Sequence, residues 1–164
     1  MDRQQIGVKL TIDALELTFS VETFENRLIL QKAIYLAQAS GVNLGYYYHW
    51  YLHGPYSPSL TKDEYSIAID LANGMEDYKG WKLDKVSETK LKQLKALIPK
   101  TPDEHKKRLK LELLASTHYL IDRNEVPRNN AAEVVKVFRR FKKNFKEDEV
   151  KEAIKELKSY ALFA

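Results

Sequence analysis

The sequence predicts a mainly α-helical fold with a small two-stranded antiparallel ribbon, arranged as a winged-helix-like core with packed C-terminal helices. Apolar residues recur at helical spacing over most of the chain, and helix-start signals precede several of these segments. Only residues 46–52 and 81–86 have a strand-like pattern. The resulting order of helix, strand, helix, strand within residues 25–86 indicates the winged-helix-like core.

The motif-bearing core is expected at about residues 6–98. The segment 6–19 fits both a strand and a helix, and its length favours a helix. The next helix, at 23–40, has apolar residues on most sides, which is typical of a central helix. A serine followed by a proline predicts the start of a helix at 58–73. Leucines at helical spacing predict a further helix at about 91–98.

The C-terminal helical part is expected at about residues 101–164. Thr101-Pro102-Asp103-Glu104 has the pattern of a capping box, so Thr101 is expected to cap the first of these helices. Asn130 is expected to cap the second. The link between the two parts is short, so residues 1–164 are expected to form a single domain. The helices of this part are expected at about residues 101–121, 130–144 and 147–162.

Composition excludes several classes of protein. Of the 164 residues, 44% are apolar and 11% are aromatic, which excludes an intrinsically disordered chain. There is no cysteine, so disulfides, thiolate metal sites and a cysteine nucleophile are excluded. No apolar run approaches the roughly 20 residues of a membrane span, and the first residues lack the apolar segment of a signal peptide. We therefore expect a cytoplasmic protein without a membrane partner.

No pattern of residues indicates a catalytic, metal or cofactor site. His49 and His53 are four residues apart, but on a strand this spacing spans about 13 Å, which is too far for one metal ion. The metalloprotease pattern, a glycine-rich phosphate loop and the nucleophile elbow are absent from the sequence. We therefore expect a protein that is not an enzyme and has no cofactor.

One segment, which we call the aromatic corner, combines aromatic residues with a restricted backbone. Two prolines and a glycine limit its conformations, which suits a turn that presents side chains. As a binding surface it would take a peptide segment or a nucleotide base, and we expect a protein partner. The alternative is a strand-to-helix corner whose rings fill the core. The residues of the aromatic corner are Trp50, Tyr51, His53, Gly54, Pro55, Tyr56, Ser57 and Pro58.

The net charge of +4 is unevenly distributed. Residues 1–80 contain 6 Lys or Arg and 10 Asp or Glu, whereas residues 81–164 contain 21 and 13. On the helix expected from residue 130, four cations follow helical spacing and form a basic stripe that can track a phosphate backbone. The alternative is a solvated helix face. The residues of the basic stripe are Lys136, Arg139, Arg140 and Lys143.

Residues 23–65 carry a family resemblance. Leu30-Gln31-Lys32, followed by Trp50-Tyr51 and by Gly54-Pro55-Tyr56-Ser57-Pro58, resembles the YwgA-like bacterial proteins, which are described as transcriptional regulators of unassigned function. The same elements are similar to the Panacea (SocA-like) antitoxin domain, although Panacea domains usually have valine after Gly-Pro. The resemblance implies a mostly helical fold and an antitoxin or adaptor role through protein contacts.

The helix of the Leu-Gln-Lys element also carries a polar stripe of Gln31, Tyr35 and Gln38. Such a stripe on an apolar helix should form hydrogen bonds, either with the backbone of residues 54–58, which we expect, or with an external partner. The leading hypothesis is a non-enzymatic interaction or regulatory module, antitoxin-like or associated with phage defence. A nucleic-acid-binding regulator that uses the basic stripe is the alternative.

Overall fold

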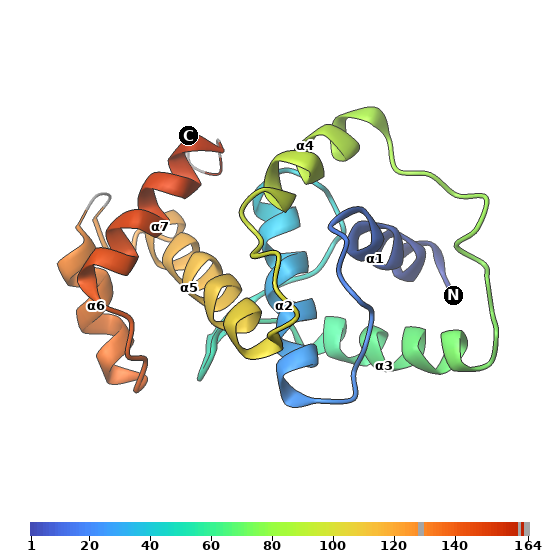
Figure 1. Cartoon of the computed structure of the whole chain (residues 1–164), viewed down its shortest axis with the longest axis horizontal. Helices are drawn as coiled ribbons and strands as arrows, with labels where there is room; N and C mark the ends of the chain where they lie inside the picture. Colours follow the sequence, from blue (N-terminus) through green and yellow to red (C-terminus); the bar gives the residue numbers. More distant parts are fainter. Residues whose placement is uncertain (128–129, 161, 163–164) are drawn as a thin grey trace.

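The computed structural model describes residues 1–127, 130–160 and 162, and within them it contains seven α-helices and one β-hairpin (Figure 1). The predicted class, a mainly α-helical fold with a two-stranded antiparallel ribbon, is confirmed. In chain order, the elements are α1 (Arg3–Ala14), α2 (Phe24–Ala39), β1 (His49–Tyr51), β2 (Gly54–Tyr56), α3 (Pro58–Ala72), α4 (Lys85–Lys95), α5 (Glu104–Asp122), α6 (Ala131–Arg140) and α7 (Glu147–Ser159).

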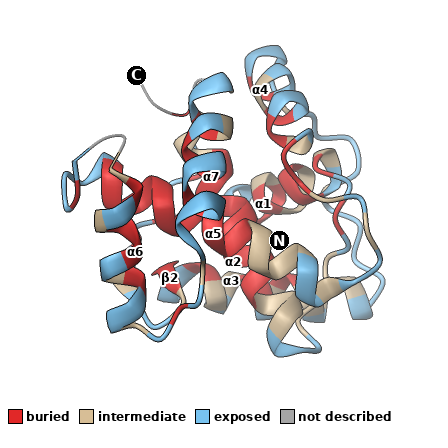
Figure 2. Cartoon of the chain, turned by 60° about the vertical axis from the view of Figure 1, so that its left-hand side comes forward, coloured by how far each residue is buried: buried red, intermediate tan, exposed pale blue. Residues whose placement is uncertain are grey.

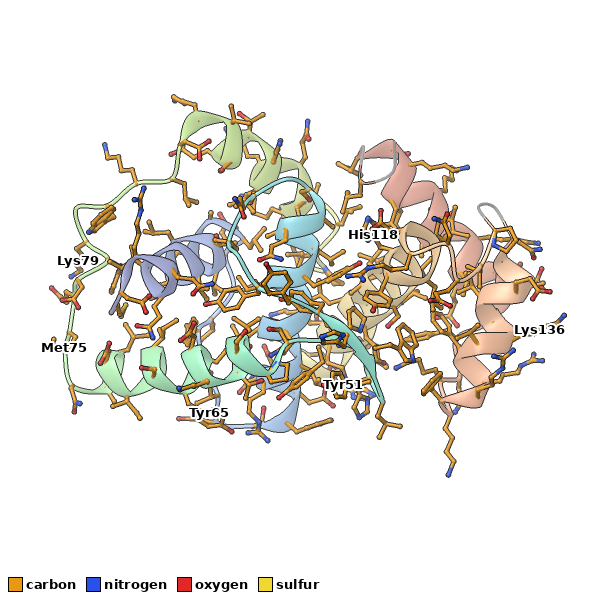
Figure 3. The ribbon with its side chains drawn as sticks, turned by 180° about the vertical axis from the view of Figure 1, so that it is seen from behind. Tyr51, Tyr65, Met75, Lys79, His118 and Lys136 are labelled. Carbon is orange, nitrogen blue, oxygen red and sulfur yellow. The ribbon has the colours of Figure 1, made fainter. Side chains whose placement is uncertain are left out.

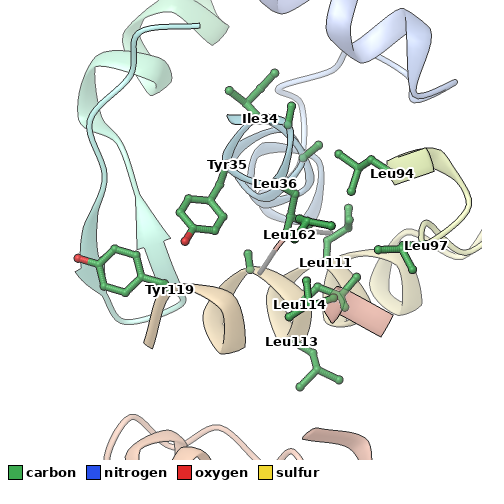
Figure 4. Close-up of a cluster of buried hydrophobic side chains, with 14 of the residues drawn as sticks. Ile34, Tyr35, Leu36, Leu94, Leu97, Leu111, Leu113, Leu114, Tyr119 and Leu162 are labelled. Carbon is green, nitrogen blue, oxygen red and sulfur yellow. The ribbon is translucent and has the colours of Figure 1, made fainter. Parts of the chain in front are cut away.

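Helix α2 lies at the centre of the fold. It contacts α1, α3, α4 and α5, while α7 packs on α5 and α6 packs on α7 (Figure 1). Every residue of α2 from 28 to 37 is buried, as its apolar pattern predicts. One cluster of buried apolar side chains runs through both the N-terminal and the C-terminal part, and in Figure 4 Leu111 and Leu114 of α5 lie on the side of α2.

The two strands form a tight hairpin between α2 and α3, closed by a turn at Leu52 and His53. The strand predicted at 81–86 is wrong, because Trp81 is half exposed and Asp84 already caps α4. The order of elements is therefore helix, strand, strand, helix. The winged-helix-like core was predicted from the order helix, strand, helix, strand, which the structure does not have. The register pairs His49 with Tyr56, Trp50 with Pro55, and Tyr51 with Gly54.

Helix boundaries differ from the sequence predictions by a few residues. Helices α3 and α6 begin where predicted, capped by Ser57 and Asn130. Helix α5 begins later than predicted, because the side chain that accepts a hydrogen bond from its first turn is that of Asp103 and not that of Thr101. Helix α1 begins at Arg3 and ends before the predicted segment does.

Buried residues face the interior between the helices, and exposed residues cover the outer faces (Figure 2). None of the helices described has both the length and the hydropathy that crossing a membrane requires. Several large polar side chains are nevertheless buried, among them Gln31, Lys32, Glu64 and Glu112. Three of these four lie close to the hairpin or to the cavity beside it, which directs attention to that region.

Candidate functional site

Two polar side chains of α2 fix the base of the hairpin from inside. The Gln31 amide donates to Ser57 O and its carbonyl oxygen accepts from Ser57 N, both at 2.9 Å. Lys32 Nζ donates to Pro55 O at 2.7 Å. Because both side chains are buried, these bonds satisfy backbone groups that water does not reach. The expectation that the polar stripe binds the backbone of residues 54–58 is confirmed for Gln31.

The other two residues of the polar stripe bind elsewhere within the protein. The Gln38 amide bonds to Tyr46 N and Tyr46 O at 2.9 Å each, which holds the segment that leads into the hairpin. The Tyr35 hydroxyl lies 2.7 Å from His118 Nδ1 on α5. The stripe therefore joins α2 to its neighbours and is not a surface for an external partner.

Gly54 allows the hairpin to lie directly against α5. Its φ is +87°, a conformation that side chains disfavour, and a Cβ at this position would overlap Ser116 Oγ of α5. Ser116 is completely buried, so its hydroxyl could turn aside only within the close-packed interior. The glycine of the aromatic corner is therefore required for close packing of backbone against helix.

The turn of the hairpin projects from this fixed base. Leu52 is 62% exposed, Tyr51 is 45% exposed, and Phe24 at the start of α2 is 48% exposed. The Phe24 and His53 rings have centroids 5.1 Å apart. Tyr51, labelled in Figure 3, packs edge to face on Tyr56 at 5.2 Å. We call the exposed surface formed by Phe24, Tyr51, Leu52 and His53 the hairpin tip.

Some residues of the aromatic corner thus support the hairpin from inside, and others are exposed at the surface. Trp50 is only partly exposed, and its ring packs against Tyr119 and Phe141, so the alternative of a core role holds for it. Three further residues are buried, and the prediction that they contact a partner is wrong because they hold the hairpin against α2 and α5: Gly54, Pro55 and Ser57. Besides Trp50, the corner residues that solvent reaches are Tyr51, His53, Tyr56 and Pro58.

A cavity of about 570 Å³ opens beside the hairpin tip, between α5 and the connection from α6 to α7. Its wall contains the buried carboxylate of Glu112, which lies among three nitrogen-bearing side chains. Arg108 Nη1 is 3.2 Å from Glu112 Oε2, while His53 Nδ1 and Lys143 Nζ are 3.1 and 3.3 Å from Oε1. Because Leu52 and His53 line this cavity as well, the tip and the cavity form one continuous site.

Lys143 is the cation of this cavity whose bonding is least complete. Its side chain is only 4% exposed, and burial lowers its pKa. Nζ lies within ion-pair distance of Glu112, but the geometry is not that of a hydrogen bond, and within the described part of the chain Nζ has no hydrogen-bond partner. A buried ammonium with unused donors is unfavourable. An anionic oxygen that entered the cavity would satisfy it.

The predicted basic stripe is broken where α6 ends. The helix ends at Arg140 and Lys142 has φ +57°, so Lys143 does not continue the helical spacing and is buried in the cavity wall. The prediction that it belongs to an exposed stripe is therefore wrong. Arg139 and Arg140 remain exposed. Lys136, labelled in Figure 3, is exposed as well and forms an ion pair within α6.

A second buried carboxyl group lies on α3, outside the cavity. Glu64 of α3 is completely buried, and neither of its carboxyl oxygens has a hydrogen-bond partner among the residues that the structure describes. Burial raises the pKa of Glu64 to about 9 and lowers the pKa of Lys32 to about 7. At neutral pH Glu64 is therefore protonated, which reduces the cost of burying it.

Sequence reasoning missed Glu112 and Glu64. The signal for Glu112 was present, since it stands among Leu111, Leu113 and Leu114 on a helix that is apolar on that side. A charged residue within such a run predicts a buried partner. Of its partners, Arg108 lies four residues earlier on the same helix, whereas Lys143 is 31 positions further along the chain and its pairing was not readable.

Comparison with protein-family models, with curated proteins and with solved structures finds no match for this chain. The resemblance of residues 23–65 to the YwgA-like and Panacea groups therefore stays a prediction. Among the described residues, no group of three or more His, Cys, Asp or Glu is placed to hold a metal ion. The hairpin tip and the cavity are the candidate binding surfaces that remain.

Proposed function

We propose that the protein is a non-enzymatic interaction module that binds a partner protein through the hairpin tip. The observation that carries this proposal is the contrast between an exposed apolar tip and a fixed base. Phe24, Tyr51 and Leu52 are each at least 45% exposed. The backbone directly behind them is held by the buried bonds of Gln31 and Lys32.

Two physical arguments support this reading. Neighbouring exposed apolar side chains mark interaction sites more often than scattered ones do, and tyrosine is enriched among the residues that dominate binding energy. A surface that is already rigid also loses less conformational entropy when it binds. The resemblance of residues 23–65 supports the same role, and we infer from it an antitoxin-like or regulatory module.

The test compares two serine substitutions at equally exposed apolar positions. Leu52→Ser removes an apolar side chain from the hairpin tip, and Ile69→Ser does the same on α3, where Ile69 is 61% exposed. Affinity capture with the wild-type chain identifies the partner, whose recovery is then measured with each variant. We expect recovery to fall about tenfold for Leu52→Ser, as for a central binding residue, and to stay unchanged for Ile69→Ser. Equal recovery with both variants contradicts the proposal.

Nucleic-acid binding is the second candidate, and the exposed guanidinium groups of Arg139 and Arg140 favour it. Without Lys143, these side chains form a short cationic face on α6. Binding to a DNA or RNA duplex should weaken steeply as salt is raised. It should also be lost in the variant Arg139→Glu/Arg140→Glu. Absence of binding at low salt, or equal binding by the variant, contradicts this candidate.

A further inference from the structure

The cavity beside the hairpin tip has an apolar wall and a cationic rim. Leucine and phenylalanine side chains form much of the wall, among them Leu52, Leu113 and Phe141. Five Lys or Arg side chains but only two Glu side chains line the cavity. This combination suits a ligand that is both apolar and negatively charged.

Part of the positive charge is balanced within the protein, and part is not. Arg108 and Lys110 each form ion pairs with glutamates. Lys106 and Lys142 have exposed side chains without a carboxylate partner in the described ranges. The buried Lys143 Nζ has no hydrogen-bond partner there. The two ammonium groups at the rim are therefore available to an anionic ligand, and Lys143, which is paired with Glu112, still has N–H donors that form no hydrogen bond among the described residues.

The arrangement of rings favours a peptide over a nucleic acid. Single-stranded nucleic acids bind largely by stacking bases on free aromatic faces. The Phe141 ring packs against Trp50 with centroids 5.4 Å apart, and the Phe145 ring packs against Phe138 at 5.6 Å. These rings contribute to the wall but already have aromatic neighbours. Aromatic neighbours leave less ring face on which a base could stack, and such a wall suits the aliphatic side chains of a peptide.

We propose that the cavity binds an acidic segment of the partner protein. An apolar side chain of this segment packs on Leu52 and Phe141, and an Asp or Glu carboxylate beside it accepts hydrogen bonds from Lys143. Further carboxylates of the segment lie near Lys106 and Lys142 at the rim. This inference rests on the proposed protein-binding function and names the chemistry of the segment that is bound.

Selection of short random peptides displayed on phage, with the full chain immobilised, tests this proposal. We expect the enriched peptides to combine acidic with apolar residues. Their affinity is then measured, as synthetic peptides, for the rim variant Lys106→Gln/Lys142→Gln. Its matched control is Arg139→Gln/Arg140→Gln, which removes the same charge outside the cavity. The rim variant should bind about tenfold more weakly than the wild type, and the control about equally.

A third variant, Lys143→Gln, examines the buried ammonium. Lys143→Gln should also weaken the binding of the same peptides. A loss of affinity that is confined to peptides with a carboxylate supports the contact between that carboxylate and Lys143. If this variant does not fold, the exposed rim variant still decides the question, because Lys106 and Lys142 lie outside the core. An oligonucleotide duplex that displaces the peptides, and that binds only with intact Lys106 and Lys142, overturns the proposal.

The other outcomes separate this inference from the proposed function. If the enriched peptides are neutral or basic and require Leu52, the proposal of an acidic segment is overturned and the protein-binding function stays in place. Acidic peptides that require the rim lysines but tolerate Leu52→Ser support the cavity and contradict the role of the tip. Acidic peptides that bind the rim variant and the wild type equally overturn the acidic segment. A selection that enriches nothing overturns both.

Discussion

A binding surface was predicted from the sequence for the hairpin and another for helix α6. The two predictions differ in which of their residues are exposed in the structure. In the hairpin, the predicted residues divide into an exposed tip and a buried base. Of the four cations of the basic stripe, three lie on an exposed face of α6, and the fourth, Lys143, follows the helix and is buried against Glu112. Both predictions assumed that one local pattern forms one surface.

The difference shows what each pattern encodes. The residues that hold the hairpin backbone are Gly54, which belongs to the aromatic corner, and Gln31 and Lys32 of the Leu-Gln-Lys element on α2. The residue most exposed at the tip, Leu52, is unremarkable in sequence. The basic pattern in turn depends on a helix that continues to its last member, and α6 ends before Lys143.

The largest expected effect breaks the base of the hairpin. Gly54→Ala introduces a Cβ that overlaps Ser116 Oγ at a positive φ, so we expect a loss of about 3 kcal/mol or more in the free energy of unfolding. Gly74→Ala is the matched control, because Gly74 also has a positive φ but no atom near its missing Cβ. It should cost only about 1 kcal/mol. Urea denaturation measures both, and equal losses contradict the close packing of the hairpin on α5.

The second-largest effect is expected when a hydrogen-bonding side chain at the base of the hairpin is removed without creating a clash. Gln31→Ala leaves the buried Ser57 N without its acceptor, while Ser57 O keeps the bond from Thr61 N, and this should cost about 2 kcal/mol in the free energy of unfolding. Gln93→Ala, at an exposed position of α4, should change it by less than about 0.5 kcal/mol. Thermal or urea unfolding of the two variants provides the comparison. A small effect at Gln31 would show that the base is held by other contacts.

The third effect concerns the protonated carboxyl group of Glu64 on α3. The pKa of Glu64 is raised by burial from 4.5 to about 9. Its contribution to stability is therefore complete below pH 4.5 and is lost as the pH rises towards 9. Relative to Glu64→Gln, the wild-type free energy of unfolding should fall by about 1 kcal/mol per pH unit within that range.

Urea unfolding of the wild type and of Glu64→Gln at a series of pH values measures this dependence. Taking the difference between the two chains cancels the titration of groups that do not interact with Glu64, such as His53 and His118, whereas Lys32 interacts with Glu64 and contributes to the difference. Glu88→Gln, at an exposed position of α4, reports the effect of exchanging a carboxylate for an amide. A difference between wild type and Glu64→Gln that is constant with pH would mean that Glu64 is ionised in the folded protein.

The smallest effects on stability are expected at the exposed side chains of both surfaces. Leu52→Ser on the hairpin tip and Arg139→Gln on α6 should each change the free energy of unfolding by less than about 0.5 kcal/mol. Their side chains are exposed and bury little apolar area. Urea denaturation of the two variants checks this expectation. A large loss at Leu52 would show that the tip belongs to the core rather than to a binding surface.

Much of the fold could be predicted from the sequence because it depends on local signals. Apolar spacing predicted α2 as the central helix, and Ser57 with Pro58 predicted the start of α3. The second strand was predicted in the wrong place, since Gly54 and Pro55 are poor strand formers. They pair with β1 because a two-residue turn brings them there and α2 holds them.

The candidate site could be predicted only in part. The exposed residues Tyr51 and His53 were among the predicted contacts. The cavity was not predicted, because His53, Glu112 and Lys143 come from three segments that only tertiary packing brings together. Periodicity and capping describe single elements, so they carry no information about tertiary contacts between elements.

The most direct test of the account is photo-crosslinking from single positions in cells that make the protein. A benzoylphenylalanine replaces Leu52 on the hairpin tip or, as the control, Ile69 on α3, which is equally exposed. The account predicts a discrete crosslinked partner protein from position 52 and none from position 69. Crosslinking of the same partner from both positions, or from position 69 alone, would contradict the assignment of the hairpin tip as the binding surface.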